Sequence, residues 1–339
     1  MHASVKDVAA VAGVAASTVS NYLNRPHLLS DKTRQKVESA IETVGFVPNQ
    51  SARQLRAGSS KELALVLLDA WLPYFSDLSR GVEDGVLGEG WTLFFSNSAR
   101  DPKRELANLA TFEAHRVQGL IISPQGKVAS RLEQLQDRGI ECVVIGPTEH
   151  SGRVSSVLFD DVRGGELAGE HLVQLGRRRL AFLGNPHQVI QSADRLAGMV
   201  RATTKAGTDT TVMTVSVRDL TVEEGMDAAR QILVLPNSER PDAVFAANDM
   251  VALGALTAFL RAGIRVPEDI AVVGFDDVAY ASQTVVPLTS VRQPAYAMGR
   301  AAAMRLLTQI GSPGSRAVEN QMFEPELVVR ESTVGRRAE

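Results

Sequence analysis

Apolar residues recur at helical spacing in three short stretches at the start of the chain. The first stretch ends at Gly13, a residue typical of helix C-termini. The second covers residues 16–23, and the third begins at Ser30 or Asp31 and ends at Gly45. Helices of this length are unstable alone in water, so we expect the three to share one small core.

The first two predicted helices are separated by a short glycine-containing turn, which is typical of a helix-turn-helix. In the second helix, Val19 and Leu23 are four residues apart and should face the core. The opposite face has short side chains that fit a DNA major groove, namely Ala16, Ser17, Ser20 and Asn21. The alternative interpretation is an ordinary solvent-exposed helix face.

Beyond residue 60, apolar runs alternate with helix-like stretches such as 103–116, 163–175, 222–233 and 250–262. Most runs are aliphatic and β-branched, which is typical of parallel strands covered by helices on both faces. We therefore predict doubly wound parallel α/β sheets, and the number of runs favours two of them. The runs cover residues 63–68, 91–96, 117–123, 141–145, 156–159, 180–184, 211–215, 243–247 and 270–275.

Ligands of such sheets bind beyond the carboxyl ends of the strands. An aromatic cluster at residues 71–75 follows the first run, in a chain that is only 5% aromatic. Aromatic faces stack on sugar or purine rings, although a packed helix start explains the cluster equally well. Side chains that hydrogen-bond hydroxyls or ring edges follow later runs, namely Ser123, Asp160, Asn248 and Asp276.

Charge is unevenly distributed along the 339 residues. Residues 1–60 contain seven Lys or Arg and four Asp or Glu, a net +3, whereas the whole chain has −3, which leaves −6 for the other 279 residues. A basic segment on an acidic body suggests contact with a polyanion such as DNA. A solvated surface is the alternative for so small a charge.

The sequence also argues against several classes of protein. The longest aliphatic run, residues 63–68, is far shorter than the roughly 20 apolar residues of a membrane span. The N-terminus lacks the apolar segment of a secretion signal, so we expect a cytoplasmic protein that does not contact membranes. Cys142 is the one cysteine, the histidines are scattered, and common catalytic motifs do not occur. We therefore expect neither an enzyme nor a metal or cofactor site.

Residues 5–58 contain the elements TVS-x-x-x-N, S-x-K-T-R and PN-x-x-A-x-x-L. This segment resembles the DNA-binding headpiece of the LacI/GalR family of bacterial repressors. The resemblance implies a helix-turn-helix headpiece at residues 1–48, with residues 16–23 as its recognition helix. Two departures, Ala15 where a serine usually caps the helix and Asn21 where arginine is common, leave the outer operator bases open. The implied DNA contacts are Ser4, Ala16, Ser17, Thr18, Ser20, Asn21, Asn24 and Thr33.

Residues 49–60 are similar to the family's hinge helix and linker, which would order when two copies meet over the operator centre. Asn49 is a potential helix cap. The resemblance implies that Ala52 packs against its dimer mate and that Leu55 wedges into the minor groove. Arg53 and Arg56 would neutralise phosphates. A flexible linker is the alternative.

The chain from residue 61 to about 335 resembles the family's effector-binding core, which is similar to periplasmic sugar-binding proteins. The resemblance implies two Rossmann-like subdomains with breaks near residues 159–161, 287–292 and 322–325. The N-subdomain would comprise about 61–159 and 290–322, and the C-subdomain about 160–288 and 323–335.

Arg195 lies in an R-L-A-G motif whose arginine holds the effector in the family. Leu220 takes the position where relatives have a stacking aromatic, so a planar ring would be held less firmly. Together with the strand-end residues, we expect effector contacts from Leu72, Tyr74, Phe75, Ser123, Asp160, Arg195, Leu220, Asn248, Asp276 and Gln293.

We therefore predict an effector-responsive repressor that binds double-stranded operator DNA of pseudo-palindromic sequence. The chain lacks the leucine heptads that some relatives use to form tetramers, so we expect a homodimer. The effector is expected to be a carbohydrate, and a purine-like or nucleoside-like molecule is the alternative. A cytosolic solute-binding receptor without DNA function and a sugar-modifying enzyme are the competing functions. The sequence does not decide whether the effector induces or corepresses.

Overall fold

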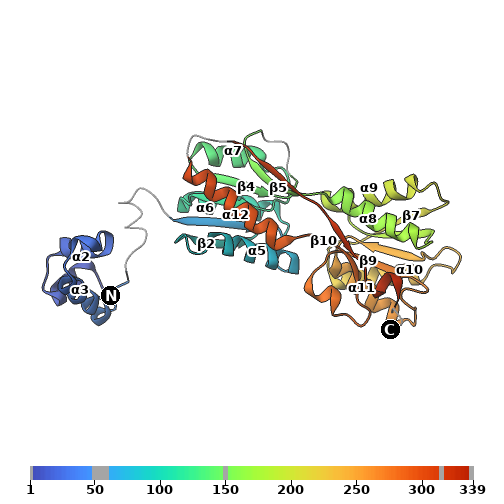
Figure 1. The fold of residues 1–339 in the computed structure, drawn as a ribbon, viewed down its shortest axis with the longest axis horizontal. Helices are drawn as coiled ribbons and strands as arrows, with labels where there is room; N and C mark the ends of the chain where they lie inside the picture. The colour runs from blue at the N-terminus through green and yellow to red at the C-terminus, as the bar shows by residue number, and fades with distance from the viewer. Residues whose placement is uncertain (1–2, 48–60, 148–151, 313–316, 336–339) are drawn as a thin grey trace. The chain divides into compact units, whose positions relative to one another are not determined.

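The computed structural model describes residues 3–47, 61–147, 152–312 and 317–335. The chain divides into a unit of residues 1–60 and a unit of residues 61–339 (Figure 1). Among the described residues, no helix has the length and apolar character needed to cross a lipid bilayer.

The first unit contains helices α1 (Val5–Ala12), α2 (Ala16–Asn24) and α3 (Asp31–Val44), with the short 3₁₀ turn η1 (Pro26–Leu28) after α2. The three predicted helices are therefore confirmed. Helix α1 starts with a capping box, in which Asp7 N donates to Ser4 Oγ and Ser4 N donates to Asp7 Oδ2. The helices share a small core that consists of Val8, Ala9, Val19, Val37, Ala40 and Phe46.

The described residues of the second unit form two six-stranded sheets. The first has the order β11-β5-β4-β3-β1-β2, with β1 (Glu62–Leu67), β2 (Thr92–Asn97), β3 (Gly119–Ile122), β4 (Glu141–Ile145), β5 (Ser155–Phe159) and β11 (Asn320–Phe323). The second has the order β12-β10-β9-β8-β6-β7, with β6 (Arg179–Gly184), β7 (Thr211–Ser216), β8 (Ala243–Ala246), β9 (Ala271–Asp276), β10 (Thr289–Arg292) and β12 (Glu326–Val328). All described pairings are parallel except the one between β10 and β12.

Helices follow most strands, as expected for doubly wound sheets. With the first sheet lie α5 (Pro73–Val86), α6 (Pro102–His115), α7 (Ala129–Asp137) and α12 (Ala295–Gly311), and α5 packs along α12 (Figure 1). With the second sheet lie α8 (Asp161–Gln174), α9 (Ile190–Lys205), α10 (Val222–Leu233), α11 (Asp249–Arg261), the 3₁₀ turn η2 (Ala279–Ser282) and α13 (Glu331–Val334). The predicted fold class is confirmed, and every predicted apolar run overlaps a strand.

Within the ranges that the structure describes, the chain passes between the two sheets at three places. It leaves the first sheet after Phe159 at the end of β5, and it returns at residues 293–294, between β10 and α12. It leaves again at residues 324–325, between β11 and β12. Because β10 belongs to the second sheet, the second crossover lies a few residues beyond the predicted position at 287–292.

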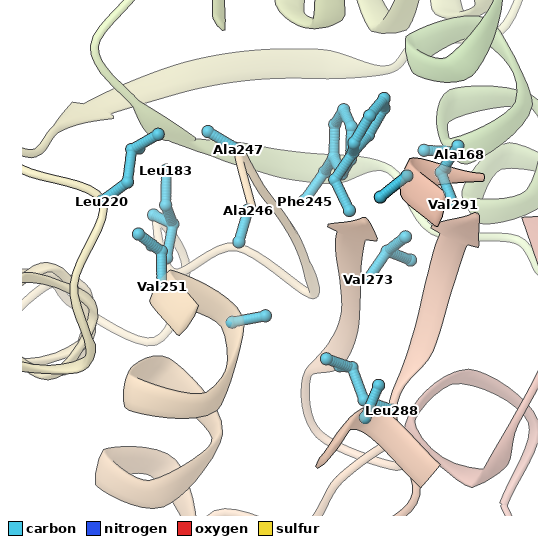
Figure 2. Close-up of a cluster of buried hydrophobic side chains, with 14 of the residues drawn as sticks. Ala168, Leu183, Leu220, Phe245, Ala246, Ala247, Val251, Val273, Leu288 and Val291 are labelled. Atoms are coloured by element: carbon cyan, nitrogen blue, oxygen red, sulfur yellow. The ribbon is translucent and has the colours of Figure 1, made fainter. Parts of the chain in front are cut away.

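Large apolar side chains fill the second sheet's core. Phe182, Phe245 and Phe275 are fully buried, and the ring centroids of Phe182 and Phe245 are 5.5 Å apart. Figure 2 shows Phe245 near Val273 of the neighbouring strand β9, with Val291 on the next strand along. The strand register places these three rings on one face of the sheet, and the alternate residues Val244 and Val272 are fully buried on the other face. Burial on both faces explains why these strands are continuous apolar runs in the sequence.

Candidate functional site

A cavity of about 200 Å³ lies at the carboxyl ends of strands from both sheets of the second unit. Ser123 follows β3, Ala247 and Asn248 follow β8, and Asp276 ends β9. The cavity is therefore where ligands of parallel α/β sheets bind. Nine of the ten predicted effector contacts line it, namely Leu72, Tyr74, Phe75, Ser123, Arg195, Leu220, Asn248, Asp276 and Gln293.

Arg195 is held by the close approach of helices α8 and α9. A Cβ atom on Gly165 of α8 would lie 2.0 Å from the Arg195 carbonyl oxygen, so only glycine permits this contact. The side chain is 8% exposed, and its Cζ lies 3.5 Å from the centroid of the Phe275 ring. The packing therefore fixes the guanidinium in the cavity wall.

The Arg195 guanidinium contacts several chain segments at once. Its Nε donates to Asp161 Oδ1 at 2.7 Å, and its Nη1 donates to the carbonyl oxygen of Ala247. Nη1 also lies 3.9 Å from Asp276 Oδ1, and Nη2 donates to Gln293 Oε1 at 3.5 Å. One cation thus lies close to two carboxylates of the cavity lining, Asp161 and Asp276, whose side chains are 6% and 10% exposed.

Burial shifts the protonation of both carboxylates. It raises the pKa of Asp161, although the adjacent Arg195 acts in the opposite direction. Burial likewise raises the pKa of Asp276 to about 7; Arg195 lowers this value, and the neighbouring Asp161 raises it further. Asp276 therefore titrates near neutral pH.

Gln293 connects the two sides of the cavity. Its Nε2 donates to the Tyr74 hydroxyl of α5 at 2.9 Å, while its Oε1 accepts from Arg195 of α9. Its backbone N–H donates to the Asp276 carbonyl oxygen at 3.3 Å. Burial raises the pKa of Tyr74, so its hydroxyl stays protonated and can donate to a ligand or accept from one.

The structure places Asp160 outside the cavity lining, although the sequence predicted a contact there. Its Oδ1 accepts from Arg163 N at 2.8 Å and caps α8. The next residue, Asp161, lines the cavity instead. Sequence reasoning missed Asp161, because two adjacent aspartates at a helix start give no indication of which one caps the helix.

Asn248 and Leu220 lie together on the other side of the cavity. Asn248 caps α11 through Val251 N at 3.0 Å, and its Nδ2 donates to the Leu220 carbonyl oxygen at 3.3 Å. The cap therefore also positions the loop that presents Leu220 to the cavity. The side chain at this position is aliphatic and offers no ring for stacking.

Arg100 is a second cavity residue that sequence reasoning missed. It follows β2 in the left-handed region, with φ 58°. Its Nε lies 3.2 Å from Asp69 Oδ2, and its Nη1 lies 3.7 Å from Asp219 Oδ1, in the loop after β7 of the other sheet. The strand-end position was a usable signal, because Arg100 follows the second apolar run.

The expected DNA contacts of the first unit differ in how far they are exposed to solvent. Ser4, Ala16, Ser17, Asn21 and Asn24 are exposed, whereas Thr18, Ser20 and Thr33 are half-buried. Ala15 precedes α2 and makes no side-chain cap, in agreement with its departure from the family pattern. The expected hinge contacts, Asn49, Ala52, Arg53, Leu55 and Arg56, lie outside the described residues.

Several of these polar side chains of the first unit already have partners within it. Ser4 caps α1, and Asn24 Nδ2 donates to the Ser20 carbonyl oxygen at 2.8 Å. Thr33 lies 2.9 Å from Ser30, oxygen to oxygen. Ser17 and Asn21 project from α2 at exposed positions. In the described part of the chain, no group of three or more His, Cys, Asp or Glu side chains is placed to hold a metal ion.

Comparison with known proteins finds similarity along almost the whole chain. The family described as "Bacterial regulatory proteins, lacI family" matches residues 4–49, and a "Periplasmic binding protein-like domain" matches residues 170–333. The HTH-type transcriptional repressor PurR of Erwinia tasmaniensis is 33% identical, over 97% of this chain and 96% of that protein. The ribose operon repressor of Escherichia coli is 32% identical, over 92% and 94%.

A solved structure is similar over the same extent. The lac repressor dimer bound to operator and the anti-inducer ONPF superimposes with a TM-score of 0.84. It is 28% identical, and the match covers 98% of this chain and 99% of that one.

Proposed function

This chain belongs to the lacI family of bacterial regulatory proteins, and we propose that it represses transcription as a homodimer on a pseudo-palindromic operator under the control of a carbohydrate. Its relatives are transcriptional repressors, which confirms that the chain is an effector-responsive DNA-binding regulator and not an enzyme. The headpiece match at residues 4–49 disfavours a receptor without DNA function.

The headpiece is assigned to operator binding. The exposed Ser17 and Asn21 of α2 would read base edges in the major groove, and Ala16 would contact a base methyl group. The net charge of +3 on residues 1–60 supplies attraction to phosphates. As part of this proposal, the protein acts in the bacterial cytoplasm.

The proposed class of effector rests on the charged side chains that line the cavity. Arg195 donates and Asp161 and Asp276 accept, so the set suits a neutral molecule with several hydroxyls. A carboxylate or phosphate would face two buried acids, which disfavours anionic effectors. Leu220 offers no stacking surface, which makes a purine the weaker alternative. D-ribose is the first probe, because a relative is named as the ribose operon repressor.

Fluorescence anisotropy with DNA from upstream of the chain's own gene tests this function. The protein should bind this DNA in preference to a scrambled duplex, and D-ribose or cellobiose should change the affinity. Failure to prefer any upstream segment would contradict the repressor assignment. A response to hypoxanthine but to neither sugar would replace the carbohydrate by a purine.

The domain boundaries are proposed from the strand order. We assign residues 61–159 and 294–323 to the N-subdomain, and residues 160–292 and 326–335 to the C-subdomain. The cavity then lies between the two subdomains, with Gln293 at a crossover. Closure of such a cavity around a ligand changes the relation between the two sheets.

A further inference from the structure

Asp276 and Asp277 are consecutive residues with different surroundings. Asp276 lines the cavity near Arg195. The Asp277 side chain is 5% exposed, and its carboxylate lies 2.9 Å from Arg292 Nε and 2.7 Å from Arg330 Nη1. Both aspartates have positive φ, 104° and 54°, which is uncommon for residues other than glycine. Surrounding contacts, and not local preference, therefore hold this turn.

The same turn is anchored from the core side. Asp277 N donates to Ser290 Oγ at 3.1 Å, and Ser290 Oγ donates to Asp249 Oδ1 at 2.6 Å. Asp249 Oδ2 accepts from Val278 N at 2.8 Å. The turn cannot shift as a whole without breaking these buried hydrogen bonds.

The two arginines lie next to the chain crossovers. Arg292 ends β10, directly before the crossover at residues 293–294. Its Nη1 lies 2.7 Å from Oε2 of Glu326, the first residue of β12 after the crossover at 324–325. Arg330 lies beyond β12 and also donates to the Leu288 carbonyl oxygen at 2.7 Å. Asp277 therefore forms ion pairs with both the segment that leaves the second sheet, through Arg292, and the segment that enters it, through Arg330.

We propose that Asp277 is a positioning residue that holds the second and third crossovers at a fixed geometry and so couples the state of the cavity to the orientation of the two subdomains. Asp276 and Asp277 share one peptide bond, so a ligand that moves Asp276 acts directly on the residue that holds the crossovers. The coupling of a bound effector to subdomain orientation rests on the proposed function. The effect of Asp277 on subdomain orientation can be measured without an effector.

The distance between the subdomains tests this role in the full-length protein without a ligand. Cys142 is buried, so nitroxide labels on Thr111→Cys and Gln231→Cys, both at exposed helix positions, report this distance by double electron–electron resonance. Dilution with unlabelled protein keeps one labelled copy per dimer. Asp277→Asn should shift or broaden the distance distribution, because the neutral amide cannot hold both arginines.

Asp269→Asn is the matched control. It removes the same charge from a side-chain pair with Arg265 on the second unit's surface, away from the crossovers. Its distance distribution should equal that of the unsubstituted protein. Arg292→Gln removes the same ion pair by replacing Arg292, whose side chain is 44% exposed. This variant tests the role of Asp277 if Asp277→Asn does not fold.

Unchanged distributions in folded Asp277→Asn or Arg292→Gln protein would overturn the proposal, as would an equal change in Asp269→Asn. When D-ribose alters operator affinity, Asp277→Asn should reduce that change at least about fivefold. Loss of operator binding by the unsubstituted protein would instead contradict the proposed function, and the distance measurement would still decide the role of Asp277.

Discussion

Arg195 Nε donates a 2.7 Å hydrogen bond to Asp161 Oδ1, and this buried pair joins α9 to the residue that begins α8 after the first crossover. The pair therefore links the expected effector contact to the chain's passage between the sheets. A ligand that competes for either group acts directly on that passage.

Arg195→Ala should abolish the effector response and leave operator binding intact. Each lost hydrogen bond to a charged group costs about 1.5–3 kcal/mol, so D-ribose should bind roughly 10-fold to 150-fold more weakly. Two buried acids would also lose their cation, at a cost of about 3–5 kcal/mol in the free energy of unfolding. Titration calorimetry and thermal unfolding measure both effects.

Arg201→Ala is the control for that variant, because Arg201 lies on the same helix and its side chain is 66% exposed. It should bind D-ribose like the unsubstituted protein. Normal sugar affinity in folded Arg195→Ala protein would remove Arg195 from the site.

Effector affinity should depend on pH through Asp276. Burial raises the pKa of this carboxyl to about 7, so it is partly protonated in the unliganded protein at neutral pH. Sugar hydroxyls donate to the ionised form, and D-ribose affinity should therefore increase up to about pH 7 and level off above it. Calorimetry across this range should show the increase, and Asp276→Asn should flatten it. A flat profile in the unsubstituted protein would contradict the role of Asp276.

The raised pKa of Asp276 also determines how its contribution to the free energy of unfolding changes with pH. The folded-state pKa of Asp276 lies above its ordinary value of 3.8, so the folded state binds the proton more tightly. This group's contribution to the free energy of unfolding should therefore fall as pH rises from about 4 to about 7. Asp276→Asn should remove this part of the decrease in the free energy of unfolding, as measured by urea unfolding at several pH values.

Leu220→Phe should shift ligand preference toward planar rings. Leu220 lines the cavity, and a ring at this position adds about 0.5–1.5 kcal/mol of aromatic contact beyond its buried area. Hypoxanthine should bind more tightly to this variant than to the unsubstituted protein, as measured by calorimetry. Unchanged hypoxanthine affinity would mean that the Leu220 loop does not face the bound ring.

Operator binding should weaken steeply as salt rises. Each neutralised phosphate contributes about −0.9 to the slope of log affinity against log salt. Ser17→Ala or Asn21→Ala should cost about 1–3 kcal/mol at the matched operator and alter the preferred outer bases. Ser39→Ala is the matched control, because Ser39 is an exposed serine on α3. Equal anisotropy titrations for Ser17→Ala, Asn21→Ala and Ser39→Ala would exclude α2 as the reading helix.

Leu55→Ala should reduce operator affinity and DNA bending together, while the affinity for D-ribose stays the same. The reason is that an apolar wedge in the minor groove unstacks a base step and bends the duplex. Hydrogen exchange over residues 49–57 should show protection only with operator DNA. Complete protection in the free protein would indicate a preformed hinge and contradict an order–disorder mechanism.

The sequence alone determined the local structure of this protein. Gly13 and Gly45 end helices at positive φ, as the pattern predicted. Ser4 caps α1, and Ser30, one of the two residues expected to start the third helix, caps α3. The predicted aliphatic runs became strands, because burial on both faces leaves a continuous apolar pattern. The short strands β10, β11 and β12 were missed, because segments of three or four mixed residues have no diagnostic periodicity.

Only the tertiary structure decided which side chains meet. Asp160 and Asp161 are adjacent and chemically equal, and the start of α8 turns one to the helix cap and the other to the cavity. Arg195, Gln293 and Tyr74 are far apart in sequence, yet crossovers bring them into one hydrogen-bonded chain. The elevated pKa of Asp276 and the burial of Asp277 arise in the same way, because desolvation and ion pairing depend on neighbours that the chain supplies only after folding.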